Sequence, residues 1–324
     1  MKPYLIGIDL GGTNIKAGIF STDFKPIEEV SFPTEAAGGS GHVFKRIREA
    51  VQLLTVEKGI SLKSIQAMGM GIPGLLDPTR GISIFSPNFP DWEQVHIVNA
   101  MKEFVEFPVF IDNDVRVNLY GEWYHGAGRG YNNLVLITLG TGLGSGIVSD
   151  GKVLYGTTYS AGEIGHMNMF RSGRPCRCGS SGCLGRYVSA VGMVYTIKEK
   201  INSGWTSIIQ DWVHGDQQRI TAQMISEAYD LGDPLAKEVM EETGVLLGFG
   251  LANVINLLNP ELIIIGGGMA AAGDRLLNPV RETVHNHALK LSGSRCRIVQ
   301  AELGAQSGTI GAAAYAYRKV TAMS

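Results

Sequence analysis

Apolar residues along the chain follow two alternating patterns. The stretches YLIGIDL (4–10) and NLVLITL (133–139) are short, mainly apolar runs that end at glycine-rich turns, and they predict buried strands. The run HVFKRIREAVQLLTVEK (42–58) spaces its apolar residues three or four positions apart and predicts an amphipathic helix. Because strand and helix patterns alternate along the sequence, the predicted fold class is α/β.

The same two patterns predict further elements up to the end of the chain. Strands are expected at IQAMGMGIPG (65–74), FPVFIDND (107–114) and ELIIIGGGM (261–269), and helices at 95–104, 187–202, 221–230, 234–258 and 308–320. A length of 324 residues is long for one hydrophobic core, so two domains are expected. The stretches 6–20 and 136–148 both have the order strand, glycine turn, strand. They predict either two similar domains that share a cleft or two unrelated hairpins.

Composition and charge exclude several classes of partner. Hydrophobic residues make up 44% of the chain and charged residues 18%, which is ordinary for a soluble globular protein. A net charge of −2 provides no field to attract nucleic acid or an anionic membrane. The uncharged windows 130–149 and 243–260 contain glycine and asparagine and predict buried elements, not membrane spans. We therefore expect a soluble cytoplasmic protein with reduced cysteines.

Glycine turns are the first candidate ligand sites. In DLGGTNIK (9–16), Gly11 and Gly12 would let backbone N–H groups approach an anion, with Thr13 as a hydroxyl donor and Lys16 as a cation. Asp9 at the strand end would hold a hydrated magnesium ion. A plain hairpin is the better explanation of any one turn taken alone, whereas the turns together favour anion binding, and none is a Walker A loop. The stretches GMGIPG (69–74) and GGGMAA (266–271) lack the context of a dinucleotide site, which sets NAD aside.

Polar residues follow one predicted strand directly. Asp112, Asn113 and Asp114 come just after FPVFI, and ligands of parallel α/β sheets bind at the carboxyl ends of strands. A carboxylate there would accept the proton of an attacking hydroxyl in phosphoryl transfer. The alternative is a helix N-cap, for which Asn and Asp are favoured residue types.

Three of the four cysteines lie within eight residues, in CRCGSSGC (176–183). Cys176, Cys178 and Cys183 offer three soft ligands, and His166, ten residues upstream, is the natural fourth ligand for tetrahedral zinc. A Cys3His set leaves no open coordination position, so the predicted zinc is structural. The alternatives are three reduced cysteines without a metal, or an iron–sulfur cluster, which three local thiols disfavour. Cys296 is remote in sequence.

Taken together, these motifs resemble the ROK sugar kinases of the actin-like ATPase superfamily. The resemblance covers nearly the whole chain and is carried by six segments: DLGGTNIK (9–16), SPNFPDW (86–92), IDNDV (111–115), LGTGLGSG (139–146), GEIGHM (162–167) and CRCGSSGC (176–183). It implies two α/β domains with a ribonuclease H-like core, hinged around a cleft. One domain would span 1–117 plus about 306–324. The other would span 118–305, with the zinc loop and dimerisation helices of a homodimer.

The resemblance also implies roles for individual residues. Asp114 would be the general base that takes the proton of a hexose 6-hydroxyl, and His166 would bind zinc through one ring nitrogen and sugar through the other. The remaining sugar contacts would be Asn88, Asn113 and Glu163. The phosphates of Mg-ATP would lie on Gly11, Gly12, Thr13, Gly140, Thr141 and Gly142, and the adenosine near Gly267 and Gly268.

The chain departs from the family pattern at one position. The family usually has Cys-x-Glu where this chain has Cys183-Leu184-Gly185, and that glutamate commonly contacts the sugar near its anomeric end. Its loss predicts either room for a bulkier group or replacement by Arg186 or water. Glucose is the expected substrate, with N-acetylmannosamine, mannose, allose and fructose as alternatives, and polyphosphate is open as a second donor.

A second functional class within the same family is the sugar-responsive repressor. Such a repressor would carry a helix-turn-helix before the first glycine motif, whereas Asp9 follows only eight residues. Retention of Asp114 and Lys16 also favours a kinase over a repressor and over a non-catalytic sugar-binding protein.

Overall fold

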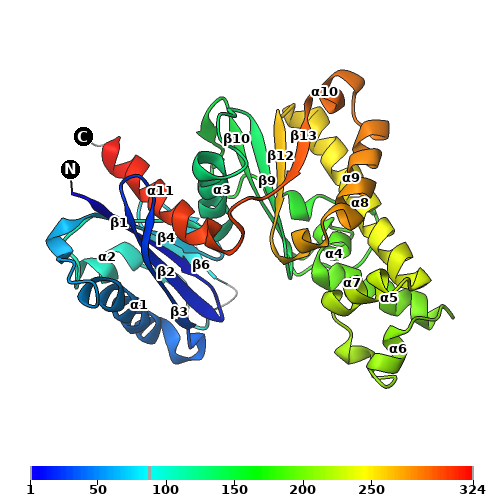
Figure 1. Cartoon of the computed structure of the whole chain (residues 1–324), viewed down its shortest axis with the longest axis horizontal. Helices are drawn as coiled ribbons and strands as arrows, with labels where there is room; N and C mark the ends of the chain where they lie inside the picture. The colour runs from blue at the N-terminus through cyan, green and yellow to red at the C-terminus, as the bar shows by residue number, and fades with distance from the viewer. Residues whose placement is uncertain (1, 87–88, 323–324) are drawn as a thin grey trace. The chain divides into compact units, whose positions relative to one another are not determined.

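The computed structural model describes residues 2–86 and 89–322, which form two compact units (Figure 1). Unit 1 comprises residues 1–130, 155–161 and 302–324, and unit 2 comprises 131–154 and 162–301. The predicted boundary at 117 would divide α3 (Asp114–His125), which lies in unit 1 and packs against α11 (Ser307–Thr321). The predicted boundary at 306 falls within the C-terminal part of unit 1, which begins at 302. The short segment 155–161 also belongs to unit 1, although the chain on both sides of it belongs to unit 2.

Unit 1 is built on a five-stranded sheet in the order β3-β2-β1-β4-β8. Its strands are β1 (Tyr4–Leu10), β2 (Asn14–Ser21), β3 (Pro26–Pro33), β4 (Ile65–Ile72) and β8 (Val109–Asn113). The first three are antiparallel neighbours, whereas β4 and β8 run parallel to β1. Apolar residues of α1 (Gly39–Val56) and α2 (Ile97–Lys102) pack on one face of this sheet. A small separate sheet joins β5 (Leu75–Asp77), β6 (Ile82–Phe85) and β7 (Glu93–Val95).

Helix α11 packs on the sheet of unit 1 at unusually close range, and glycines permit this. A Cβ atom on Gly7 of β1 would overlap the Thr309 carbonyl oxygen, and one on Gly69 of β4 would overlap the Ala312 carbonyl oxygen. On the helix, a Cβ on Gly311 would overlap the Val117 carbonyl of α3. The small residues of GTIGAAAYAY therefore match glycines on the elements that they contact.

Unit 2 repeats the strand order of unit 1 in its own sheet, β11-β10-β9-β12-β13. The strands are β9 (Leu134–Leu139), β10 (Leu143–Ser149), β11 (Lys152–Val153), β12 (Leu262–Gly266) and β13 (Arg297–Gln300). Its helices are α4 (Gly185–Val188), α5 (Ala190–Asn202), α6 (Ile209–Trp212), α7 (Ala222–Asp230), α8 (Pro234–Leu258), α9 (Asp274–His287) and α10 (Lys290–Arg295). In each unit a hairpin pairs with a parallel strand, so the prediction of two similar α/β domains is confirmed, and that of two unrelated hairpins is wrong.

Helix α8 illustrates how local chemistry sets the element bounds. The Asp233 side chain accepts a hydrogen bond from the Ala236 N–H at 2.7 Å, and Pro234 occupies the first helical turn. The helix ends at Leu258, and its C-cap Asn259, just before Pro260, has a left-handed φ of 47°. The predicted helix 234–258 is confirmed.

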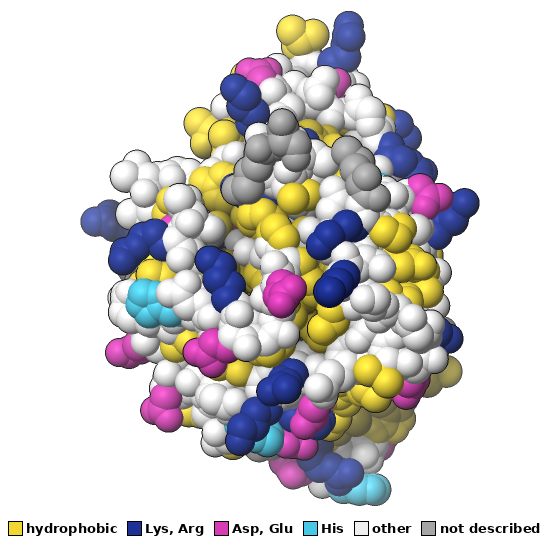
Figure 2. Space-filling model, turned by 90° about the vertical axis from the view of Figure 1, so that its left-hand side faces the viewer, with side chains coloured by type: hydrophobic (Ala, Val, Ile, Leu, Met, Phe, Trp, Pro, Cys, Tyr) yellow, Lys and Arg dark blue, Asp and Glu magenta, His cyan; other side chains and the backbone are white. Residues whose placement is uncertain are grey.

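One face of the molecule illustrates the distribution of charge. Basic and acidic side chains lie interspersed over the face shown in Figure 2, as expected for a net charge of −2. Within the part of the chain that the structure describes, none of the helices has the length and apolarity needed to cross a membrane.

Candidate active site

The first glycine turn joins β1 to β2 in unit 1, and a threonine from the end of β3 holds it. Within the turn, the Gly11 N–H donates to the Asn14 carbonyl at 2.9 Å. Thr34 is fully buried; its hydroxyl donates to the Gly11 carbonyl at 2.6 Å and its N–H donates to the Thr13 carbonyl at 2.8 Å. The turn that is expected to meet phosphate is therefore fixed by two bonds from one residue. Sequence reasoning missed Thr34, because no local pattern connects it to a turn 21 residues earlier.

Asp9 lies at the end of β1, directly across the hairpin from Lys16. Burial, reinforced by the nearby Asp114 carboxylate, raises the pKa of Asp9 to about 6 against the lowering effect of Lys16. Helix α11 also contacts this carboxylate, because a Cβ on Gly308 would overlap an oxygen of Asp9. Asp9, Lys16 and Asp114 thus form one charged group in unit 1.

Asp114 is the first residue of α3, and Asn113 caps the helix. The Asn113 side-chain oxygen accepts hydrogen bonds from the N–H groups of Val115 at 3.0 Å and Arg116 at 3.4 Å. The N-cap alternative is therefore correct for Asn113, whose amide nitrogen also donates to the Gly74 carbonyl at 3.2 Å. Burial raises the pKa of Asp114, although the Val115 N–H, the Arg116 guanidinium and the Asn113 amide each lower it.

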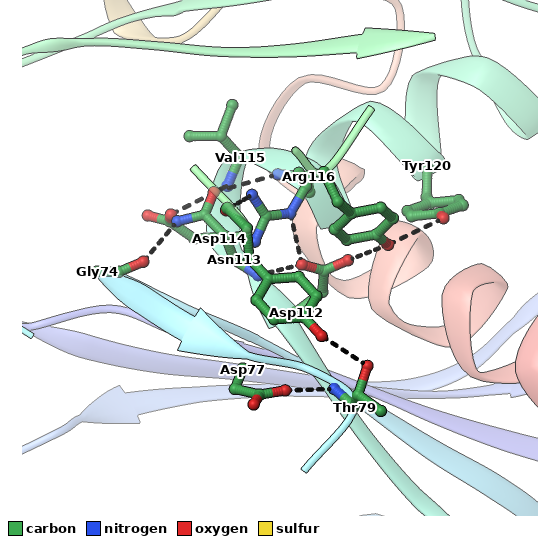
Figure 3. Close-up of polar contacts among 11 residues, drawn as sticks. Gly74, Asp77, Thr79, Asp112, Asn113, Asp114, Val115, Arg116 and Tyr120 are labelled. Carbon is green, nitrogen blue, oxygen red and sulfur yellow. Dashed lines mark hydrogen bonds and ion pairs between the residues drawn. The ribbon is translucent and has the colours of Figure 1, made fainter. Parts of the chain in front are cut away.

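Behind Asp114, the fully buried Asp112 accepts hydrogen bonds from three directions (Figure 3). Its donors are Arg116 Nε at 2.6 Å, the Tyr155 hydroxyl at 2.7 Å and the Asn113 N–H at 2.7 Å. Arg116 Nη1 donates in addition to the Tyr159 carbonyl at 2.8 Å. Residues 112 to 116 are thereby joined to the segment 155–161 of the same unit. This network also escaped prediction, because its partners are 43 residues apart in sequence.

The four predicted zinc ligands lie together in unit 2. The ligand atoms of His166, Cys176, Cys178 and Cys183 are all within 4.8 Å of one another. Cys178 Sγ lies 3.7 Å from Cys183 Sγ, and Cys176 Sγ lies 3.7 Å from His166 Nδ1. A tetrahedral site with zinc–sulfur bonds of about 2.3 Å separates its sulfurs by about 3.8 Å, so the four residues fit zinc.

The environments of the cysteine thiols differ within this group. The Ser180 N–H lowers the pKa of the exposed Cys178 thiol to about 7, whereas burial raises the pKa of Cys183 to about 12. Cys296 is half-buried and does not belong to the group.

His166 presents its two ring nitrogens to different neighbours. Nδ1 is the atom beside Cys176, and Nε2 lies 4.0 Å from Glu163 Oε2. Glu163 has an exposed side chain, at 62%. The expected sugar contacts of His166 and Glu163 remain a prediction. The remaining expected contact, Asn88, lies outside the described residues.

The second glycine turn, Gly140–Gly142, joins β9 to β10 in unit 2 and is held through the Gly140 carbonyl, which accepts from the Ala190 N–H at 2.9 Å. Gly140 and Thr141 line a cavity of 450 Å³. The rest of its lining is mainly apolar and comes from α5, α7, α8, α9 and the turn after β12: Ala190, Met193, Ala222, Gln223, Ser226, Met240, Gly268, Met269, Ala271, Ala272 and Arg275. Such a cavity suits a flat heterocycle next to phosphates.

Two details shape this cavity. Gly267 has φ of 82°, and a Cβ there would overlap the Leu139 carbonyl, so only glycine fits this turn. Arg275 donates to Asp230 at 2.7 Å and to the Ser226 carbonyl at 3.2 Å, which fixes one wall. Arg275 is a further residue that sequence reasoning missed.

Two α/β units of matching topology, each with a glycine turn after its first strand, define an actin-like ATPase fold. The sequence profile of the ROK family matches residues 5–319, and the chain belongs to the ROK family. It is 34% identical over 311 residues to a glucokinase of Halalkalibacterium halodurans, with 95% of this chain and 93% of the relative covered. A glucokinase of Thermotoga maritima is 34% identical over 312 residues, with 96% of each protein covered.

A solved structure agrees with these relatives. The ROK family glucokinase from Streptomyces griseus, in complex with glucose and AMPPNP, matches with a TM-score of 0.81 and 31% identity, covering 97% of this chain and 99% of that one. The predicted two-domain sugar-kinase fold is therefore confirmed.

Proposed function

We propose that the protein is an ATP-dependent glucokinase that transfers the γ-phosphate of ATP to the 6-hydroxyl of glucose. The observation that carries this proposal is Asp114, a carboxylate with a raised pKa at a strand end, next to the glycine turn of unit 1. Likeness over almost the full length of two glucokinases supports glucose as the substrate.

In the proposed reaction, Asp114 accepts the proton of the sugar 6-hydroxyl while that oxygen attacks the γ-phosphorus. A new oxygen–phosphorus bond forms, the bond from the γ-phosphorus to the bridging oxygen breaks, and ADP leaves. A raised pKa brings the base closer to the working pH, which favours proton transfer. Backbone N–H groups of the two turns and Lys16 would hold the phosphates. Magnesium bound with ATP would neutralise phosphate charge, and Asp9 would hold its hydration shell.

The test is ADP release with ATP and magnesium over a panel of hexoses, using wild type and Asp114→Asn. We expect turnover on glucose and a fall in kcat of about 100-fold or more in the variant, with glucose affinity nearly unchanged. Asp211→Asn, on the exposed surface of α6, is the matched control and should keep full activity. A kcat close to wild type in Asp114→Asn would remove Asp114 from this role.

We also propose that the Cys3His group binds one structural zinc ion per chain. Metal analysis of the purified protein should give one zinc, and Cys178→Ala should lose both the metal and thermal stability. Cys296→Ala removes a thiol outside the group and should retain the zinc. A wild-type protein that folds and contains no metal would refute the proposal.

Gly185 tests whether glucose is preferred over other hexoses. An ideal Cβ at Gly185 would lie 3.3 Å from the Gly165 carbonyl oxygen and 3.4 Å from Leu143 Cβ, so a side chain fits there after a small shift. Gly185→Glu should raise the ratio of glucose to N-acetylmannosamine turnover, because it restores a hydrogen-bond acceptor. An unchanged ratio would mean that position 185 does not select the sugar.

A further inference from the structure

A second cavity in unit 2, of 260 Å³, lies between the glycine turn and the cysteine loop. Its lining includes Thr141 and Gly142 of the turn, together with His166, Arg177 and Arg186. No carboxylate is among the described residues that line it, and Gly185 occupies the place where a glutamate was expected. The cavity therefore combines two guanidinium groups with a glycine turn and has no acidic side chain to balance them.

Arg186 is the more enclosed of the two arginines. Its Nε is shielded from solvent and has no hydrogen-bond partner within residues 2–86 and 89–322. The guanidinium lies over the Tyr195 ring, whose centre is 5.1 Å away. An enclosed donor without a partner is unfavourable, so it points to a group that binds there.

Arg174 of the cysteine loop shows the contrasting case. Its guanidinium pairs with Glu199 at 2.5 Å, donates to the Thr196 hydroxyl at 2.9 Å and donates to the carbonyl of Arg186 at 2.9 Å. All three partners are groups of the protein itself, so these donors of Arg174 are already occupied. Arg174 thus anchors the loop, whereas Arg186 lines the cavity and its Nε has no such partner among the described residues.

We infer that this cavity binds a phosphate-type anion through Arg186, with Arg177 at its rim. A planar guanidinium donates two parallel hydrogen bonds to phosphate oxygens, and the adjoining glycine turn offers backbone N–H groups. The anion is either the terminal phosphate of ATP or an anionic substituent of the sugar. In the first case Arg186 stabilises the charge on the transferring phosphoryl group. The inference rests on the proposed function for the donor, but anion binding itself does not require turnover.

The experiment compares binding of AMPPNP and ADP by calorimetry in wild type, Arg186→Gln and Arg186→Lys. If the terminal phosphate occupies the cavity, Arg186→Gln should weaken AMPPNP binding by about 10-fold or more and leave ADP binding within about twofold. Arg186→Lys should recover part of the loss, since lysine keeps the charge without the fork. Arg171→Gln changes an exposed arginine near the loop that does not line the cavity and should bind like wild type.

A parallel series measures glucose and glucuronate binding in the same proteins, with circular dichroism to confirm folding. If Arg186→Gln weakens glucuronate alone, the cavity binds anions on the sugar side. If it changes neither AMPPNP nor glucuronate binding, the inference is wrong. A wild-type protein that binds AMPPNP but phosphorylates no sugar would refute the proposed function, while the effect of Arg186→Gln on AMPPNP would still decide the inference.

Discussion

The buried ion pair behind Asp114 leads to a quantitative prediction for Arg116→Met. Arg116 and Asp112 have side chains exposed by only 6% and 0% and lie 2.6 Å apart. Methionine keeps most of the apolar stem but removes the charge. The buried Asp112 carboxylate then keeps two donors among the described residues, the Tyr155 hydroxyl and the Asn113 N–H. Removing one partner of a buried pair costs about 3–5 kcal/mol. For a unit of this size, that lowers Tm by on the order of 10 °C.

The structure offers a matched control for this change. Lys58 and Glu28 also lie 2.6 Å apart in unit 1, but their side chains are exposed by 43% and 29%. Because water already solvates this pair, Lys58→Met should leave Tm almost unchanged. The two variants therefore remove ion pairs of equal length that differ in burial.

Differential scanning calorimetry of the two variants measures the difference, and a double variant tests its cause. Arg116→Met combined with Asp112→Asn no longer buries an uncompensated charge, so it should be more stable than Arg116→Met alone. A Tm shift in Arg116→Met no larger than that in Lys58→Met would refute the argument from burial. A double variant less stable than either single variant would show that packing, and not charge, dominates.

Three further predictions concern the site in unit 1. Burial raises the pKa of Asp114, and the base must be ionised to accept a proton. We therefore expect kcat/KM to fall as the pH drops through a value above the ordinary aspartate pKa of about 4. A fall in kcat/KM that begins only at or below pH 4 would contradict this. Thr34→Val should raise KM for ATP by about 5- to 10-fold, whereas Thr34→Ser, which keeps the hydroxyl, should be near wild type. The control Thr55→Val loses a similar buried hydrogen bond to the Val51 carbonyl and should lower only Tm. Gly308→Ala should displace the Asp9 carboxylate, so that the loss in kcat, expressed as a free energy, exceeds the loss in the free energy of unfolding. Equal losses in the two free energies would refute this prediction.

Much of the fold could be predicted from the sequence, since its signals are local. The strands at 4–10 and 133–139 can be recognised from an apolar run and the glycine turn that follows it, without knowledge of tertiary contacts. Both are present, as β1 and β9. The cysteine group was also predictable, because three of its ligands share one loop and the fourth is ten residues away. Element ends were less predictable: the helix predicted at 95–104 is limited to α2 (Ile97–Lys102), and the one predicted at 187–202 is divided into α4 and α5. The small sheet β5–β7 was not predicted.

The parts that escaped prediction depend on contacts between distant segments. The hydroxyl of Tyr155 reaches Asp112 across 43 residues, and Thr34 holds a turn formed by residues near the N-terminus. Neither tyrosine nor threonine signals such a role by type or spacing, because both are common in strands and loops. The residues that carry chemistry were therefore accessible from motifs, whereas the residues that support them required the folded chain.

The place of α11 in unit 1 has a consequence for protein synthesis. The sheet face formed by residues such as Leu5, Phe20 and Ala67 is covered by Ile310, Ala313 and Ala316 of α11. On the ribosome, all of unit 2 is made before that helix, which at about 5–20 residues per second takes on the order of 10 to 30 s. During this interval the nascent N-terminal sheet exposes an apolar face lined by glycines. Unit 1 thus begins to form first and is completed last, when α11 covers this face.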